Sequence, residues 1–442
     1  MTASEARRDL PTISVTPATG LIDEPLHIVA RRLPPGAAMT IRARLLDPND
    51  VLWSSHATYT ANGDGLVDLT SQAPVSGTYR GVDGDGLISS LAPDDRVSPR
   101  TFDASSVAPL LVDFTADLGG QHIASAHVRR LYITDGVRMT SVREHSLSGL
   151  FFEPGTDGPR PGIIVVGGSS GKLLFAAQVA ALLAGHGYPS LALAYFGLDD
   201  LPPHLTEIPI AYFSRAIDWL SSQSTVRPDA LGVIGRSRGA ELALLLGSRL
   251  PCIRAVVAYC PSGIVWNGLG DDVPTELPAW CDASGPIPFL SLMSPELSEV
   301  RTRVFQNGPV ALSPLFDAAL DLPIPPDTVI PVEKTNGPIL LISGEEDQMW
   351  PSTRMGDQIM RRLEAQAHPF ASRHCRYPGA GHLMRPPGVS TSVLQNKFAF
   401  GGHAPMQAAA NRAAWAETLS FLHATLDVRS WSDVPDVMGA VR

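Results

Sequence analysis

Ser237 lies at the centre of the pentapeptide Gly235–Gly239, which reads Gly-Arg-Ser-Arg-Gly. The apolar run Leu231–Ile234 precedes it and an alanine- and leucine-rich run begins at Ala240, so the sequence predicts a strand, a sharp turn and a helix. The two glycines let the backbone crowd where a Cβ would clash. This setting presents a serine hydroxyl as a nucleophile, whereas a glycine-flanked serine on its own would be an ordinary turn residue.

A histidine downstream offers a base for this serine. A serine hydroxyl is a weak nucleophile at neutral pH, so it needs a histidine to take its proton and an acid to orient that histidine. His382 follows the strand expected to end at Tyr377–Pro378, where a histidine can reach over the nucleophile. The other candidates are placed less well: His186 and His204 precede the serine, His374 lies within a strand, and His403 follows the last strand.

The acid is expected after the strand that ends at Ser343–Gly344. In the fold that carries such a serine turn, the nucleophile, the acid and the base come in that order along the chain. Three carboxyl groups compete at this place: Glu345, Glu346 and Asp347. Position after the strand does not separate them. The whole pattern predicts an α/β-hydrolase with a catalytic triad.

Stabilising the oxyanion that forms on attack requires preorganised N–H donors. The backbone N–H of Arg238 is the first expected donor, and the loop Gly167–Gly171 is expected to supply the second. That loop lacks the spacing of dinucleotide- and phosphate-binding loops, so those chemistries lose support. The side chains of Arg236 and Arg238 either contact a carboxylate or phosphate of the substrate or pair with acidic neighbours such as Glu241, and the sequence leaves both open.

Composition narrows the classes of partner. Hydrophobic residues make up 44% and charged residues 18% of the 442-residue chain, which suits a large buried core. The formal net charge of −10 argues against a nucleic-acid partner. The four cysteines have no CxxC spacing, so no zinc site or disulfide framework is expected, and neither is a cofactor. No apolar run is long enough to span a bilayer and Met1–Pro11 lacks the core of a secretory signal, so we expect a cytoplasmic protein.

Two domains are expected from the rhythm of the chain. Residues 10–140 hold short β-rich runs between turn residues, as at 26–30, 39–45 and 65–69, which predicts an antiparallel β-sandwich. Residues 141–430 alternate strands with helices, which predicts a doubly wound parallel sheet. The expected strands are 163–166, 190–195, 231–234, 255–259, 339–342 and 373–377, and the expected helices are 173–186, 207–222, 240–250, 352–367 and 404–426. Residues 263–336 break the alternation, contain a helix near 314–320, and are expected to form a lid or pocket wall.

Short motifs spread over nearly the whole chain resemble those of a known protein family. They are Leu21–Ile28, Leu33–Gly36 and Gly77–Val82 in the first part, and Leu193–Phe196, Ala216–Leu220 and Tyr377–His382 in the second. In these segments and their order, the chain resembles the acyl-CoA thioesterase and bile acid-CoA:amino acid N-acyltransferase family. The resemblance implies Asp347 as the triad acid and the neighbourhood of Ser169 as the source of the second oxyanion donor. The chain departs from the family pattern at Gly84–Ser90 and in the bulk of Arg236 and Arg238, which puts substrate identity in doubt more than mechanism.

The function expected from this resemblance is hydrolysis of an acyl-CoA or other acyl thioester through an acyl-serine intermediate. In the family a cysteine nucleophile accompanies transfer to an amine, so a serine favours hydrolysis. Three alternatives stay open at the level of the sequence. They are an acyltransferase or cyclising thioesterase of secondary metabolism, a carboxylesterase or dienelactone-type hydrolase, and a non-catalytic binding protein on a hydrolase scaffold.

Overall fold

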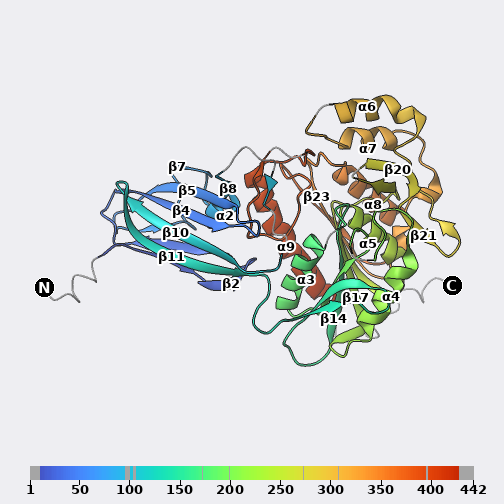
Figure 1. Cartoon of the computed structure of the whole chain (residues 1–442), viewed down its shortest axis with the longest axis horizontal. Helices are drawn as coiled ribbons and strands as arrows, with labels where there is room; N and C mark the ends of the chain where they lie inside the picture. The colour runs from blue at the N-terminus through green and yellow to red at the C-terminus, as the bar shows by residue number, and fades with distance from the viewer. Residues whose placement is uncertain are drawn as a thin grey trace. The chain divides into compact units, whose positions relative to one another are not determined.

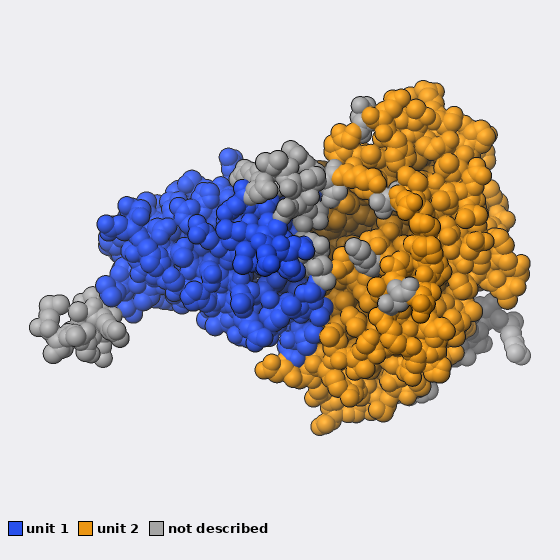
Figure 2. Space-filling model, viewed as in Figure 1, with its two compact units in different colours: residues 1–134, 387–396 blue, residues 135–386, 397–442 orange. Residues whose placement is uncertain are grey.

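The computed structural model describes residues 10–94, 100–102, 106–171, 173–198, 200–271, 273–306, 308–394 and 397–427. The chain divides into two compact units, which Figure 1 shows as ribbons and Figure 2 as solid surfaces. Unit 1 holds Met1–Thr134 and Pro387–Asn396, and unit 2 holds Asp135–Pro386 and Lys397–Arg442. No helix in the described ranges is both long and apolar enough to cross a membrane.

Unit 1 is built from β-sheets. A three-stranded sheet has the order β1 (Thr12–Thr16), β3 (His27–Arg31), β6 (Val67–Asp68). The larger sheet runs β2 (Thr19–Leu21), β11 (Gln121–Leu131), β10 (Leu110–Leu118), β4 (Ala38–Leu46), β5 (Leu52–Thr60), β7 (Ser76–Gly77), with β8 (Ala92–Pro93) also paired to β5. Side chains of β4 and β5 alternate between buried and exposed, as in a sheet with one covered face. The expected strands correspond to β3, β4 and β6, while the packing of a sandwich stays a prediction.

A later segment of the chain also belongs to unit 1. Ser390 donates its hydroxyl hydrogen to the carbonyl of Leu91 at 2.6 Å, and the N–H of Thr391 donates to the carbonyl of Ser89 at 3.0 Å. Strand β25 (Val393–Leu394) pairs with β9 (Arg100–Thr101). Ser89, which accepts the bond from Thr391, is the last residue of the helix α2 (Gly86–Ser89). The sequence pattern counts residues 387–396 with the second domain, because nothing local marks a return to the first.

Unit 2 is a doubly wound sheet of the α/β-hydrolase class (Figure 1). Its strands, in sheet order, are β12 (Arg138–Val142), β13 (Ser148–Glu153), β15 (Ser190–Ala194), β14 (Arg160–Val166), β17 (Val226–Arg236), β18 (Ile253–Tyr259), β23 (Ile339–Gly344) and β24 (Arg373–Tyr377). The pairs β12–β13 and β13–β15 are antiparallel, and the other neighbours are parallel. The central strands are buried along most of their length, as strands covered on both faces must be.

Helices cover both faces of this sheet. They are α3 (Leu174–Gly185), α4 (Ile210–Ser221), α5 (Arg238–Arg249), α8 (Ser352–Ala365) and α9 (Ala404–Leu426). Val256 of β18 packs against Gly247 of α5, whereas the hydroxyl of Tyr259 lies 2.5 Å from the hydroxyl of Thr418 in α9. These two residues are three apart on one strand, so their side chains point to opposite faces and α5 and α9 cover opposite sides.

Strand β17 and helix α4 begin at other residues than expected, and in both cases the pairing of strands explains the difference. Strand β17 begins at Val226, five residues before the apolar run, because its first residues pair with β14 although they include exposed polar side chains. Helix α4 begins at Ile210, not residue 207, because Ile208–Pro209 form the short strand β16, which pairs with β21 (Trp280–Asp282). Hydrophobic pattern therefore marks the buried middle of an element better than its ends.

The segment 263–336 is more regular than its sequence suggests. It contains the hairpin β19 (Asn267–Gly270) and β20 (Val273–Pro278), the hairpin β21 and β22 (Gly285–Pro286), and the helices α6 (Ser298–Gln306) and α7 (Ser313–Leu320). Trp266 and Trp280 of this segment are fully buried. The Phe316 ring of α7 makes edge-to-face contacts with Trp266 and Trp350. The segment is therefore packed into unit 2, while its role as a lid stays a prediction.

Candidate active site

Ser237 occupies a strained turn between a strand and a helix. Strand β17 ends at Arg236 and helix α5 begins at Arg238, and Ser237 between them has φ 58° and ψ −124°. Such a backbone conformation costs a non-glycine residue about 1–3 kcal/mol. It is held by the N–H of Ser237, which donates to the carbonyl of Tyr259 at 2.8 Å, and by the N–H of Ala240, which donates to the carbonyl of Ser237 at 2.8 Å. The strain therefore presents the serine side chain ahead of the helix.

Close backbone packing explains the flanking glycines. A Cβ on Gly235 would lie 1.9 Å from the carbonyl oxygen of Gly239, and a Cβ on Gly239 would lie 2.1 Å from that of Gly167. A Cβ on Gly168 would lie 3.6 Å from Oγ of Ser237. The loop Gly167–Gly171 thus runs beside the serine hydroxyl, where the sequence expected a second oxyanion donor. Ser169, in this loop, is half-buried.

His382 joins the serine to a buried carboxylate. Its Nε2 lies 3.0 Å from Oγ of Ser237, and its Nδ1 lies 2.8 Å from Oδ2 of Asp347. His382 is 6% and Asp347 8% exposed, so the pair is shielded from water. Glu345 and Glu346 do not reach His382 in this way, and the Glu346 carboxylate instead lies 3.5 Å from His403. The structure therefore brings Asp347, His382 and Ser237 together in one hydrogen-bonded chain.

The Asp347 carboxylate is fixed by three further donors. The N–H groups of Met349 and Trp350 donate to Oδ1 at 2.9 and 3.2 Å, and the hydroxyl of Ser352 donates to Oδ2 at 2.7 Å. The ring of Trp350 packs edge-to-face on His382 with centroids 6.2 Å apart. Sequence reasoning did not single out these donors, although a serine at the start of a helix, five residues after the acid, is a readable signal. They hold the orientation of the carboxylate.

A buried thiol borders this chain of hydrogen bonds. Sγ of Cys260, an imidazole nitrogen of His382 and a carboxylate oxygen of Asp347 all lie within 4.8 Å of one another. The thiol donates to the carbonyl of His382 at 3.4 Å. Burial raises the pKa of Cys260 well above its ordinary value, so it stays a neutral thiol at neutral pH. Both ring nitrogens of His382 already face hydrogen-bond partners, so the cluster fits a proton relay better than a metal site.

The two arginines beside the serine have different surroundings. Arg238 is 4% exposed and its Nε lies 3.3 Å from the fully buried carboxylate of Glu241, while its Nη2 donates to the carbonyl of Trp266 at 3.1 Å. Glu241 also accepts from the indole N–H of Trp280 at 2.7 Å, and its burial raises its pKa to about 7. Of the two readings left open by the sequence, pairing with Glu241 holds for Arg238. Arg236 is half-buried, and its guanidinium carbon lies 4.5 Å from the centroid of the Phe175 ring.

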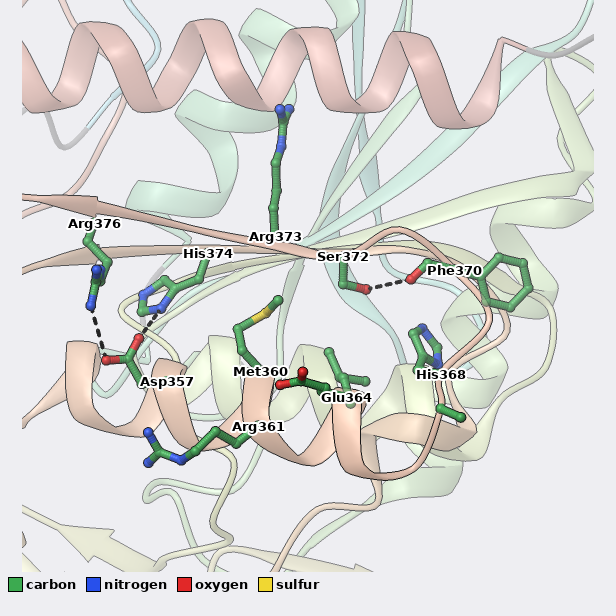
Figure 3. Close-up of a pocket in the computed structure, with 12 residues that line it drawn as sticks. Asp357, Met360, Arg361, Glu364, His368, Phe370, Ser372, Arg373, His374 and Arg376 are labelled. Atoms are coloured by element: carbon green, nitrogen blue, oxygen red, sulfur yellow. Dashed lines mark hydrogen bonds and ion pairs between the residues drawn. The ribbon is translucent and has the colours of Figure 1, made fainter.

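A second serine, histidine and aspartate meet at the edge of the sheet. Nε2 of His374 lies 2.7 Å from Oγ of Ser343, and Nδ1 lies 3.0 Å from Oδ1 of Asp357. Figure 3 shows Asp357 of α8 bound by both His374 and Arg376 of β24. These three residues are among those that line an open cavity of about 800 Å³. Ser343 is 0% exposed, so no substrate carbonyl reaches its hydroxyl. This arrangement cross-links α8, β23 and β24, and burial lowers the pKa of His374.

Comparison with known proteins identifies the family. The model described as "BAAT / Acyl-CoA thioester hydrolase C terminal" matches residues 208–428, and "Acyl-CoA thioester hydrolase/BAAT N-terminal region" matches residues 23–144. The chain belongs to this family. It is 32% identical to mouse acyl-coenzyme A thioesterase 1, over 91% of this chain and 94% of the relative. It is also 32% identical to mouse acyl-coenzyme A amino acid N-acyltransferase 2, over 92% of this chain and 96% of the relative.

A further relative and a solved structure are also similar to this chain. Mouse acyl-coenzyme A thioesterase 2, a mitochondrial protein, is 32% identical over 95% of this chain and 90% of its own length. Among solved structures, a putative dienelactone hydrolase from Klebsiella pneumoniae matches 65% of this chain and 97% of its own, with a TM-score of 0.40 and 16% identity. The family resemblance inferred from the motifs is thus confirmed by the matches along the chain.

Replacing Gly239 with alanine tests the close packing at the serine turn. The added Cβ would overlap the carbonyl oxygen of Gly167 at 2.1 Å, so we expect Gly239→Ala to destabilise the protein by about 3 kcal/mol. The free energy of unfolding in urea measures this. Gly136→Ala is the matched control, since its Cβ would meet nothing nearer than 4.0 Å, and it should be close to neutral. Equal stability of the two variants would contradict the packing argument.

Breaking the Arg238–Glu241 pair tests its structural role. Arg238→Met leaves the Glu241 carboxylate buried without its cation, and we expect a loss of about 3–5 kcal/mol in unfolding free energy. Adding Glu241→Gln to that variant removes the uncompensated charge and should recover most of the loss. Additive losses in the double variant would mean that the two side chains do not interact.

Proposed function

We propose that the protein hydrolyses acyl thioesters with Ser237 as nucleophile, His382 as general base and Asp347 as the acid that orients it. The observation that carries this proposal is the unbroken chain of hydrogen bonds from the buried Asp347 carboxylate to the hydroxyl of Ser237. That geometry matches the distances a base needs for proton transfer. The strained turn and the start of helix α5 add what acyl transfer requires, a partly exposed serine and nearby N–H groups.

This arrangement supports a reaction in two steps, acylation of Ser237 and hydrolysis of the acyl-serine. Nε2 of His382 takes the hydroxyl proton as Oγ of Ser237 bonds to the thioester carbonyl carbon, and the negative charge of Asp347 stabilises the imidazolium. The oxyanion is stabilised by the N–H of Arg238 and a second N–H near Ser169. The C–S bond then breaks, and the leaving thiolate takes the proton from His382. In the second step, His382 deprotonates a water that attacks the acyl-serine, and the acid leaves as Ser237 regains its proton.

The substrate class is supported by the relatives. Two of them are named acyl-coenzyme A thioesterases, so we propose an acyl-CoA or a related acyl thioester as substrate and coenzyme A as the leaving thiol. N-acyltransferases are as similar in sequence, so identity alone does not separate hydrolysis from transfer. The serine favours hydrolysis, because an acyl-serine ester is a poorer acyl donor to amines than the thioester that a cysteine would form.

We also propose that residues 263–336 form a wall of the substrate pocket. An open cavity of about 450 Å³ is lined by Ala311, which precedes helix α7, by Ser313, Pro314 and Asp317 of that helix, and by Glu346, Asp347 and Gln348. The inserted segment therefore reaches the loop that carries the proposed acid. A cytoplasmic location stays a prediction, because the relatives include a mitochondrial protein.

Thiol release from acyl-CoA esters tests the central proposal. We expect wild type to release free thiol and free acid, and Ser237→Ala to lower kcat by about 10⁶-fold, because the nucleophile is lost. A thiol-reactive dye measures release, and mass spectrometry of products formed with glycine or taurine present distinguishes free acid from conjugate. Unchanged release by the variant would show that Ser237 is not the nucleophile. Matched oxygen esters test the esterase alternative.

Two aspartates give a sharper test of the acid. Asp347→Asn keeps the volume but removes the charge that holds the His382 tautomer, so we expect kcat to fall by about 10³- to 10⁴-fold. Asp357→Asn is the matched control, since Asp357 pairs with His374 in the buried Ser343 cluster. It should cost about 1 kcal/mol of stability and leave kcat within a small factor. The proposal for Asp347 fails if both variants lose turnover equally.

A further inference from the structure

Arg236 is a charged sequence neighbour of Ser237 that takes no part in the proposed reaction. It is the last residue of β17, and its guanidinium stacks on Phe175 in the first turn of α3. Helix α3 follows the loop Gly167–Gly171, and the charge of Arg385, three residues after His382, is close enough to influence Arg236. The segments that border Ser237 therefore also border Arg236.

Arg236 has no counter-ion in the part of the chain that the structure describes. None of the ion pairs or side-chain hydrogen bonds among those residues includes it, whereas Arg238, on the other side of the same serine, pairs with Glu241. The groups that act on its charge are Arg385, a like charge, and the Cys260 thiol, which is neutral. Burial lowers the pKa of Arg236 to about 10, so it still carries its charge at neutral pH.

A half-buried guanidinium without an anion is energetically incomplete. Removing a charge from water costs free energy unless the charge is paired, and stacking on an aromatic ring compensates only part of that desolvation penalty. Because Arg236 keeps some exposed surface, a ligand can still reach it. The guanidinium fork matches a carboxylate with two parallel N–H···O bonds. An anion that arrives with the substrate would complete the pairing.

We propose that Arg236 forms an anion subsite beside Ser237 that binds a carboxylate on the acyl group, so that the preferred substrates are thioesters of short dicarboxylic acids. This inference rests on the proposed function. Arg236 is adjacent in sequence to the nucleophile, and its charge acts on the Cys260 thiol, whose Sγ lies within 4.8 Å of an imidazole nitrogen of His382, so its guanidinium lies near the proposed triad. The phosphates of coenzyme A are separated from the thioester by the whole pantetheine arm, which makes them a poorer match.

Matched pairs of substrates test the subsite. Glutaryl-CoA and pentanoyl-CoA have the same chain length and differ in the terminal carboxylate. We expect wild type to favour glutaryl-CoA in kcat/KM and Arg236→Met, which keeps the packing on Phe175, to lower that preference by about 10- to 100-fold. Arg236→Lys keeps the charge without the fork and should retain an intermediate preference. Arg361→Met removes an exposed arginine of α8 and should leave both rates and their ratio unchanged.

Further measurements distinguish which anion Arg236 binds: a phosphate of coenzyme A, the carboxylate of an amino acid acceptor, or a carboxylate of the acyl group. Glutaryl- and pentanoyl-pantetheine carry the same acyl groups without the nucleotide phosphates of coenzyme A. If Arg236 binds those phosphates, Arg236→Met will lower kcat/KM equally for both CoA esters and leave it unchanged for both pantetheine thioesters, which overturns the proposal. If Arg236 binds the carboxylate of an amino acid acceptor, the variant will lose conjugate formation with glycine while the glutaryl preference stays, which also overturns it. Retention of the glutaryl preference on pantetheine thioesters supports an acyl carboxylate.

A binding measurement keeps the subsite testable without turnover. In the Ser237→Ala background, we expect glutarate to raise the melting temperature more than pentanoate does, and Arg236→Met to abolish that difference. If wild type releases no thiol from any ester but glutarate still stabilises the protein through Arg236, the hydrolase proposal fails and the anion site stands. If thiol is released without any effect of Arg236 on the glutaryl preference, the subsite fails and the hydrolase proposal stands.

Discussion

The near contact between Gly239 and the carbonyl of Gly167 is the constraint on which the site depends. It fixes the start of helix α5 against the loop after β14, and Ser237 connects strand and helix there with a positive φ of 58°. The strain at one residue is small beside the burial energy of a sheet whose central strands are covered on both faces. A large, rigid core therefore holds a local conformation that the chain would not adopt alone.

The same sheet carries two serine–histidine–aspartate arrangements, and exposure separates their roles. Ser343 lies within β23 with no exposed surface, so its hydroxyl, His374 and Asp357 link strands to a helix. Ser237 lies beyond the end of β17, where it keeps part of its surface exposed, and the His382 that reaches it comes from a loop. Residue types alone do not make a nucleophile, because the backbone decides whether a carbonyl can approach.

Much of this could be predicted from the sequence, and the remainder depended on distant contacts. The serine turn and His382 have local signals, since a strand, a glycine and a helix follow one another in the chain. The choice of Asp347 over its two acidic neighbours needed the family resemblance, because only the folded loop turns one carboxylate toward His382. The Arg238–Glu241 pair depends on Trp266 and Trp280, which come from an inserted segment without a clear periodic pattern. Ordered hairpins in that segment were missed for the same reason.

The return of residues 387–396 to unit 1 has a consequence for how members of this family can be recombined. Unit 1 is made of two pieces of chain, and the second leaves unit 2 only a few residues after His382 and rejoins it before α9. An exchange at the single junction near residue 134 would thus transplant an incomplete first unit and leave its missing piece behind in the second. A chimera that keeps both units whole needs three crossover points, so the two units are inherited more readily together than apart.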